Sequence, residues 1–242
     1  MKNDTLIVIP VRMGSSRFPG KPLINIDGKA MIYHVWKRAI YSKCGDVIVA
    51  CCDKEVKNYL VKKDIPHVMT KKKLFSGTDR VYYAMQALLK NNNYKYIINL
   101  QGDIPDISPL SIKKLASIIK VKEVQMATLV SKIRETKIIK DKSIVKVALS
   151  KHGNFYRAFY FSRAPIPYGA SKFYEHIGIY AYKINTLKRF VSLKESALEK
   201  IESLEQLRAL EDGIQIVIGK VNKAPYSIDT PKDLKNFLKK SL

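Results

Sequence analysis

The sequence lacks any long apolar run. Its 242 residues contain no stretch of about 18 consecutive apolar residues, which is the length that a membrane-spanning helix needs. Residues 1–5 are mostly polar and a strand-like run follows at once, so we expect neither a secretory signal peptide nor a membrane partner. Cysteine is also scarce, and Cys44, Cys51 and Cys52 show no paired metal-ligand spacing. These absences predict a cytoplasmic protein with reduced cysteines.

Acidic residues are few: 21 Asp and Glu stand against 44 Lys and Arg, which gives a net charge of +23. A nucleic-acid partner therefore has to be considered. Most of the lysines are scattered along predicted helices, and the compact run is Lys71–Lys73. A nucleic-acid surface more often interleaves arginine, glycine and exposed aromatic residues. We therefore predict no nucleic-acid partner, although the charge would attract anionic substrates.

The sequence also lacks linkers, repeats and low-complexity segments, which predicts a single domain over residues 1–242. In the first half, strand and helix patterns alternate. The predicted strands are 5–10, 46–52, 65–69 and 94–100, and the predicted helices are 30–42, 54–63, 77–90 and 108–120. This alternation predicts an α/β fold with a mostly parallel sheet and helices on both faces.

The second half has a different pattern. Strand-like runs follow one another with few helices between them, over 124–133, 143–150, 154–163 and 176–184. A helix is predicted over 202–213, a strand over 214–221 and a last helix from Pro231. We therefore expect an antiparallel extension over about 143–183, which would cover the site or pair two subunits.

The loop after the first strand, residues 11–22, is rich in glycine, serine and basic residues but lacks both standard nucleotide motifs. A Walker A loop needs four residues between its glycines and a Ser or Thr after its lysine. Here five residues separate Gly14 from Gly20, and Pro22 follows Lys21. No G-x-G-x-x-G dinucleotide motif occurs. If the loop binds phosphate, it does so without the hydroxyl that would hold magnesium in a Walker A loop.

Three cationic side chains and two hydroxyls remain in this loop: Arg12, Arg17 and Lys21, with Ser15 and Ser16. Arginine binds phosphate oxygens in a bidentate manner, and lysine adds a mobile point charge. The alternative is an ordinary solvated turn. We favour a clamp for a triphosphate, because ligands of open α/β sheets bind beyond the carboxyl ends of the strands.

Two further polar clusters follow predicted strands. The stretch SGTDR (76–80) stands at a predicted helix start, where free backbone amides favour an anion or the polar edge of a base. An ordinary N-cap without a ligand would have the same sequence pattern. Asp103 directly follows a buried strand and Asp229 precedes Thr230-Pro231. Two carboxylates suit Mg²⁺, which completes its shell with phosphate oxygens and water. Alone, each aspartate could equally be a turn or helix-start residue.

Seven motifs in order resemble the 3-deoxy-D-manno-octulosonate (Kdo) cytidylyltransferase family, from Leu6 to about Leu238. They are RMGSSRFPGKPL, SGTDR, QGDIP, YFSRAPIP, HIGIYAY, LEQLRALEDG and DTPKDL. The resemblance implies a Rossmann-like nucleotidyltransferase fold and a homodimer formed by the antiparallel extension. It also implies that CTP and Kdo give CMP-Kdo and pyrophosphate, with Mg²⁺, for lipopolysaccharide biosynthesis.

The resemblance also implies roles for particular residues. The nucleotide would be bound by Arg12, Ser15, Arg17, Lys21, Ser76, Gly77, Thr78 and Arg80. Kdo would be bound by Gln101, Arg163, His176, Tyr180, Glu205 and Gln206. Mg²⁺ would be held by Asp103 and Asp229, and Lys21, Arg17 and Asp103 would act in catalysis. Both substrates are anionic, so these cations would offset the repulsion and the growing charge of the leaving group.

The sequence departs from the family pattern at three places. Ile104 takes the place of a glutamate, Cys52 that of a threonine, and the segment 168–175 is short. No general base stands out, and the sugar acid stays open between Kdo, 8-amino-Kdo and a sialic-type nonulosonate. A sugar-1-phosphate nucleotidyltransferase is disfavoured by the loop spacing. A basic RNA-binding protein is the alternative of another class.

Overall fold

A computed structural model describes residues 3–15, 17–89 and 92–241. By the density of its internal contacts the chain forms two compact units. The first contains residues 1–113 and 225–242, and the second contains residues 114–224. The expectation of a single domain over 1–242 stays a prediction.

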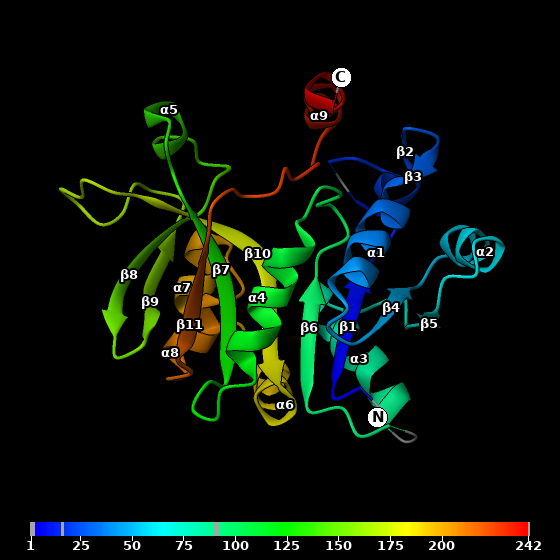
Figure 1. The fold of residues 1–242 in the computed structure, drawn as a ribbon, viewed down its shortest axis with the longest axis horizontal. Coiled ribbons are helices and arrows are strands. Elements are labelled where there is room, and N and C mark those ends of the chain that lie inside the picture. Colours follow the sequence, from blue (N-terminus) through cyan, green and yellow to red (C-terminus); the bar gives the residue numbers. More distant parts are fainter. Residues whose placement is uncertain (1–2, 16, 90–91, 242) are drawn as a thin grey trace. The chain divides into compact units, whose positions relative to one another are not determined.

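The first unit contains four parallel strands in the order β5-β4-β1-β6 (Figure 1). Their bounds are β1 Thr5–Pro10, β4 Asp46–Cys51, β5 His67–Met69 and β6 Tyr96–Leu100. Strand β1 is buried along its whole length between β4 and β6. A strand covered on both faces reads as a continuous apolar run, and this is why the sequence pattern identified it.

Helices and short elements complete the first unit. They are η1 Lys21–Leu23, β2 Asn25–Ile26, β3 Lys29–Ala30, α1 Met31–Ser42, α2 Lys54–Lys62, α3 Gly77–Leu89 and α9 Pro231–Ser241. Helix α1 buries apolar residues at helical spacing, among them Ile32, Val35 and Ala39. Helix α3 packs against β1, β4 and β6.

The second unit holds five strands in the order β10-β7-β11-β9-β8. Their bounds are β7 Met126–Lys132, β8 Lys146–His152, β9 Phe155–Ser162, β10 Tyr174–Lys183 and β11 Ile216–Val221. Strands β7 and β11 are parallel, and the other pairings are antiparallel. Strands β8, β9 and β10 lie within the range predicted for the antiparallel extension. With the parallel half, they confirm the predicted α/β fold class.

Helix α4 Pro109–Ile119 corresponds to the helix predicted over 108–120. The later helices differ from the prediction, and they are α5 Thr136–Ile139, α6 Ile184–Ser192, α7 Ala197–Glu202 and α8 Leu207–Glu211. The single helix expected over 202–213 is wrong, because Ser203 takes a left-handed backbone conformation (φ 55°) that ends α7. Helix α6 was not predicted. No helix in the described part of the chain is both long and apolar enough to span a membrane.

Candidate active site

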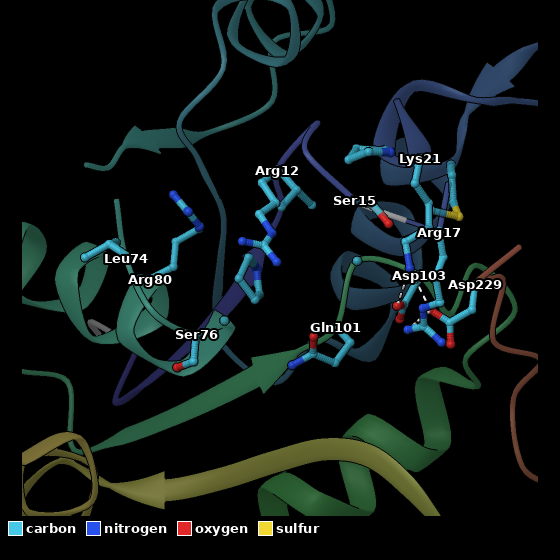
Figure 2. A pocket seen from close by; sticks show the side chains of 16 residues that line it. Arg12, Ser15, Arg17, Lys21, Leu74, Ser76, Arg80, Gln101, Asp103 and Asp229 are labelled. Carbon is cyan, nitrogen blue, oxygen red and sulfur yellow. Dashed lines mark hydrogen bonds and ion pairs between the residues drawn. The ribbon is translucent and has the colours of Figure 1, made fainter. Parts of the chain in front are cut away.

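The first unit contains a cavity of about 290 Å³ at the carboxyl ends of β1 and β6 (Figure 2). Three stretches that the sequence singled out meet there, together with the segment before α9. The lining residues are Pro10, Val11, Arg12, Ser15, Arg17, Lys21, Pro22, Met31, Leu74, Ser76, Gly77, Arg80, Gln101, Gly102, Asp103 and Asp229. Thus the structure brings together the predicted cationic loop, the start of α3 and both predicted metal ligands.

The loop after β1 closes on the carbonyl oxygen of Met13. This oxygen accepts hydrogen bonds from Ser15 N (2.9 Å) and Gly20 N (3.1 Å). Gly20 has φ 75°, which only glycine adopts readily, and the chain then enters the short helix η1 with Lys21 as its first residue. The compact turn therefore places Arg12, Ser15 and Lys21 along the same cavity.

Lys21 lies between the two predicted metal ligands. Its Nζ donates to Asp103 Oδ2 (2.7 Å) and to Asp229 Oδ1 (3.0 Å), and Arg17 Nη2 donates to the same Asp229 oxygen (3.1 Å). Burial alone would lower the pKa of Lys21, but the charges and hydrogen bonds of Asp103 and Asp229 outweigh it and raise the pKa above its ordinary value. The ammonium group therefore stays charged at any working pH.

The two aspartates meet because the segment before α9 is attached to the turn after β6. Ile228 N donates to Asp103 O (2.9 Å), and Tyr226 N donates to Asp106 Oδ1 (2.8 Å). In that turn Gly102 has no room for a side chain, because a Cβ there would lie 2.6 Å from Val11 Cγ1. The turn thus approaches the end of β1 closely and directs Asp103 towards the loop.

The carboxylate of Asp229 does not cap helix α9. Asp233 Oδ2 accepts hydrogen bonds from Asp229 N (3.1 Å) and Thr230 N (2.8 Å), and Thr230 Oγ1 accepts from Asp233 N (3.2 Å). Thr230 and Asp233 thus form a reciprocal cap at the helix start. The carboxylate of Asp229 is left to pair with Lys21 and Arg17, so the helix-start and metal-ligand interpretations of this segment are compatible.

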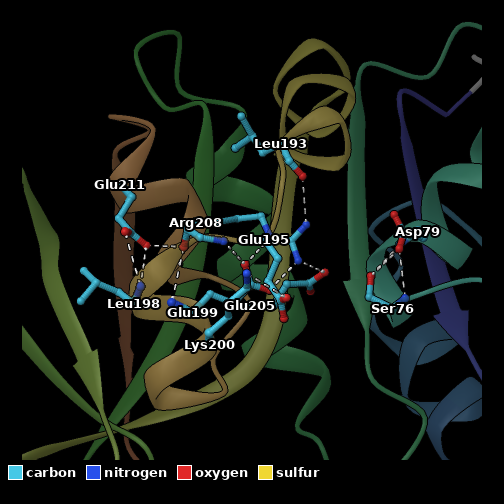
Figure 3. Close-up of polar contacts among 11 residues, drawn as sticks. Ser76, Asp79, Leu193, Glu195, Leu198, Glu199, Lys200, Glu205, Arg208 and Glu211 are labelled. Atoms are coloured by element: carbon cyan, nitrogen blue, oxygen red, sulfur yellow. Dashed lines mark hydrogen bonds and ion pairs between the residues drawn. The ribbon is translucent and has the colours of Figure 1, made fainter.

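The start of α3 combines a cap with a buried arginine. Ser76 Oγ accepts from Asp79 N (3.1 Å), and Asp79 Oδ2 accepts from Ser76 N (3.0 Å), which is a capping box (Figure 3). Arg80 lines the cavity but is 3% exposed, and its Nη1 donates to Thr70 Oγ1 and to Lys71 O. Thr78 does not line the cavity, because it is buried and accepts a hydrogen bond from Asn99 Nδ2.

Of the residues predicted to bind the sugar acid, Gln101 lies in the first unit and all the others lie in the second. His176 and Tyr180 are neighbours in β10, with ring centroids 5.3 Å apart, and burial lowers the pKa of His176 to about 3. Arg163 donates from Nε to Glu202 O and from Nη1 to Lys142 O, both at 3.1 Å. The structure thus groups His176 with Tyr180, whereas Arg163 uses two of its five N–H donors on backbone carbonyls.

Glu205 and Gln206 lie in the turn between α7 and α8 (Figure 3 labels Glu205). Glu205 Oε1 lies 4.0 Å from Arg208 Nη2, and Arg208 also forms a two-point ion pair with Glu199. Gln206 is buried, and its Nε2 has no hydrogen-bond partner among the residues that the structure describes. A buried amide without a partner is costly unless something else supplies an acceptor.

Two further residues, Ile104 and Asp53, have positions that the sequence did not reveal. Ile104, which stands in place of the family's glutamate, is 5% exposed and does not line the cavity. Asp53, which had attracted no role, accepts a hydrogen bond from Met13 N (2.8 Å) in the loop. Its position two residues past the end of β4, at the same sheet edge as the loop, is the signal that could have identified it.

The sequence profile of one family, described as cytidylyltransferase, matches residues 6–216. The chain belongs to the cytidylyltransferase family. The profile ends before Asp229 and α9, but individual relatives of this cytidylyltransferase are similar over nearly the whole chain. One is the 3-deoxy-manno-octulosonate cytidylyltransferase of Paramagnetospirillum magneticum, 42% identical over 231 residues, which are 95% of this chain and 94% of the relative.

A second relative has the same name and comes from Rickettsia prowazekii. It is 41% identical over 240 residues, covering 99% of this chain and 96% of its own. A solved structure of CMP:2-keto-3-deoxy-manno-octonic acid synthetase complexed with CTP superposes with a TM-score of 0.90. It is 36% identical and covers 99% of this cytidylyltransferase and 98% of its own chain. The described site therefore lies in a chain that these relatives match over 95–99% of its length.

The donor set of the cytidylyltransferase site also suits a metal ion. Within the described ranges, no group of three or more His, Cys, Asp or Glu side chains is arranged so that it could hold a metal ion. Asp103 and Asp229 converge on one cation, the Lys21 ammonium, and line the same cavity as the cationic loop. Mg²⁺ commonly takes only one or two carboxylates and draws its other ligands from phosphate and water. The residues present fit that mode of binding.

Proposed function

We propose that this cytidylyltransferase transfers a CMP group from CTP to the anomeric hydroxyl of Kdo, giving CMP-Kdo and pyrophosphate. The observation that carries the proposal is the cavity in which Arg12, Arg17 and Lys21 face Asp103 and Asp229. Cations and carboxylates on one cavity suit a metal-bound triphosphate. The names of the relatives support CTP and Kdo as its substrates.

The loop residues would bind the triphosphate. Arg12 and Arg17 are exposed, so their guanidinium groups are accessible to phosphate oxygens. Ser15 lines the cavity between them. Lys21 would offset the negative charge that grows on the leaving pyrophosphate. Positive charge placed in advance lowers the barrier because it needs no rearrangement as the reaction proceeds.

Asp103 and Asp229 would hold Mg²⁺. The ion would bind phosphate oxygens and lower the pKa of the attacking hydroxyl. For this the carboxylates must exchange their contacts with Lys21 for contacts with the ion, so Lys21 would turn towards the phosphates that its flexible side chain can reach. Ser76, Gly77 and Arg80 would bind the nucleotide on the other side of the cavity.

The sugar acid would be recognised by the predicted residues of the second unit, while Gln101 lines the nucleotide cavity of the first. Support comes from Gln206, whose buried Nε2 lacks a partner among the described residues, and from Arg163, which has donors left for a carboxylate. His176 has a pKa of about 3, so it would act at neutral pH as an uncharged hydrogen-bonding group. We propose with this a cytoplasmic homodimer that pairs through the antiparallel extension, which exposes Phe159 and Tyr168.

The test is a pyrophosphate-release assay with CTP, Mg²⁺ and a panel of sugar acids. Release should require all three components, with Kdo as the best acceptor, and Asp103→Ala should abolish it while the thermal midpoint of unfolding stays close to that of the wild type. Release with N-acetylneuraminate or 8-amino-Kdo in preference to Kdo would assign another sugar acid. If no sugar acid supports release and the protein binds RNA in a salt-sensitive manner, the enzymatic proposal fails.

A further inference from the structure

The backbone of Met13 fixes the loop that lines the nucleotide cavity. Its carbonyl oxygen accepts from Ser15 N and Gly20 N, which closes the loop on itself. Its N–H donates outside the loop, to Asp53 Oδ2 at 2.8 Å. At Met13 the closed loop is therefore joined by a side chain to the segment that follows β4.

The bond from Met13 continues the pairing of β1 with β4. The two strands are parallel, with Pro10 opposite Ala50, and Val11 N donates to Ala50 O (2.9 Å) just past the end of β1. Two residues further on, the next amide in this series is that of Met13. It meets the carboxylate of Asp53, so a side chain extends the sheet's hydrogen bonding into the loop.

Asp53 stands at the N-cap position of α2, where an aspartate normally accepts a bond from the first turn of its helix. No such bond is present, since the side chain makes no cap contact with α2. Its Oδ2 accepts hydrogen bonds from Met13 N and from Cys52 Sγ (3.3 Å). Burial raises the pKa of the Cys52 thiol, which keeps it protonated and able to donate. The carboxylate is therefore turned away from its own helix and towards the loop.

We propose that Asp53 is a positioning residue for nucleotide binding, because its carboxylate holds the Met13 amide and so fixes the loop that presents Arg12 and Ser15 to the triphosphate. The inference rests on the proposed function of the loop. Asp53 does not line the cavity, so it acts through Met13. A loop held in place before the ligand arrives binds it more tightly, because less conformational entropy is lost on binding.

Two other roles for Asp53 make different predictions. A residue that only stabilises the fold would change the thermal midpoint and leave the affinity of the folded protein for CTP unchanged. A residue that acts only by its charge would weaken the binding of an anion, so any neutral replacement would bind CTP more tightly. Positioning through a hydrogen bond depends instead on whether the new side chain can accept the bond from Met13 N.

The experiment compares Asp53→Ala, which removes the acceptor, with Asp53→Asn, which keeps an acceptor oxygen and loses the charge. Glu55→Ala is the matched control, because it removes an exposed carboxylate from the first turn of the same helix. The dissociation constant of CTP is measured by calorimetry, KM for CTP and for the sugar acid by kinetics, and amide exchange in residues 13–20 by mass spectrometry.

Asp53→Ala should raise the dissociation constant and KM of CTP by about tenfold, speed amide exchange in the loop and leave KM for the sugar acid unchanged. Asp53→Asn and Glu55→Ala should stay within about twofold of the wild type. Equal CTP affinity of Asp53→Ala and wild type, or tighter binding by both Asp53 variants, overturns the inference. If the wild type does not bind CTP, the proposed function fails. In that case, unchanged amide exchange of the loop in Asp53→Ala would separately show that the bond between Asp53 and Met13 N does not hold the loop.

Discussion

Lys21 is the residue on which the charges of the site converge. It is 14% exposed and bridges Asp103 and Asp229, which are 23% and 33% exposed. Its raised pKa means that the ammonium group stays charged as pH rises, and that its contribution to stability is lost only as pH passes through the folded-state pKa. The protein thus carries its own cation between two carboxylates that we propose bind magnesium.

We predict that Lys21→Met lowers the free energy of unfolding by roughly 1 kcal/mol without added metal, because two partly buried carboxylates lose their counter-charge. Added Mg²⁺ should then raise the thermal midpoint of the variant more than that of the wild type. Scanning calorimetry with and without Mg²⁺ measures both effects. As a control, Lys137→Met removes a lysine that is 82% exposed in the second unit, and it should change neither. An equal metal response in Lys21→Met and wild type would argue against the shared site.

At the scale of single residues, position relative to a strand end was the useful signal. It identified Arg12, Lys21 and Asp103, because a side chain just past a parallel strand lies at the sheet edge where ligands bind. The inward position of Thr78 was not predictable, since it depends on a contact with Asn99 in another strand. The roles implied for the individual residues stay predictions.

Helix α9 connects the stability of one element with the geometry of the site. Phe237 and Leu234 of this helix pack against a cluster built on Ile26, Met31 and Ile228. Phe18 of the cationic loop packs on the same cluster, and Asp229 lies just before the helix starts. The docking of α9 therefore supports both the loop and one of the two carboxylates.

We predict that Phe237→Ala lowers the free energy of unfolding by about 1–3 kcal/mol, below the range for a fully buried phenylalanine because the ring is only partly buried. It should also raise KM for CTP, since Phe18 and Asp229 lose support. Lys239→Ala, an exposed change on the same helix, is the control. Denaturant unfolding and steady-state kinetics give the two quantities. A loss of stability with unchanged KM would show that α9 does not position the site.

The elements themselves were predictable to different degrees. The parallel strands and their helices followed from apolar runs and helical spacing, because each is covered by its neighbours in a regular manner. The single helix predicted over 202–213 was wrong, because two short helices, α7 and α8, occupy this region. Ser203 adopts a left-handed conformation there, and the ion pair of Glu199 with Arg208 joins the two short helices (Figure 3). Apolar spacing does not reveal such an interruption.

The net charge of +23 acts on the whole molecule. It attracts anions over distances of about a Debye length, which is roughly 10 Å at 0.1 M salt. We predict that kcat/KM for CTP falls about threefold or more between about 0.05 and 0.5 M NaCl, mainly because association slows. At constant free Mg²⁺, kcat should change little. Steady-state kinetics over a salt series provides the measurement, and a salt-independent kcat/KM would mean that the lysine excess has no part in substrate capture.

The order in which the chain passes through its two units determines when the parts of the site are synthesised. The first unit is left at Lys113 and re-entered at Pro225, so Asp229 and α9 follow the whole second unit in the chain, although Asp229 pairs with Lys21. During synthesis from the N-terminus, the cationic loop and Asp103 leave the ribosome long before Asp229. A chain released before Pro225 would carry the loop without the second carboxylate. The pairing of Lys21 with Asp229 thus forms only in a chain whose second unit has already been synthesised.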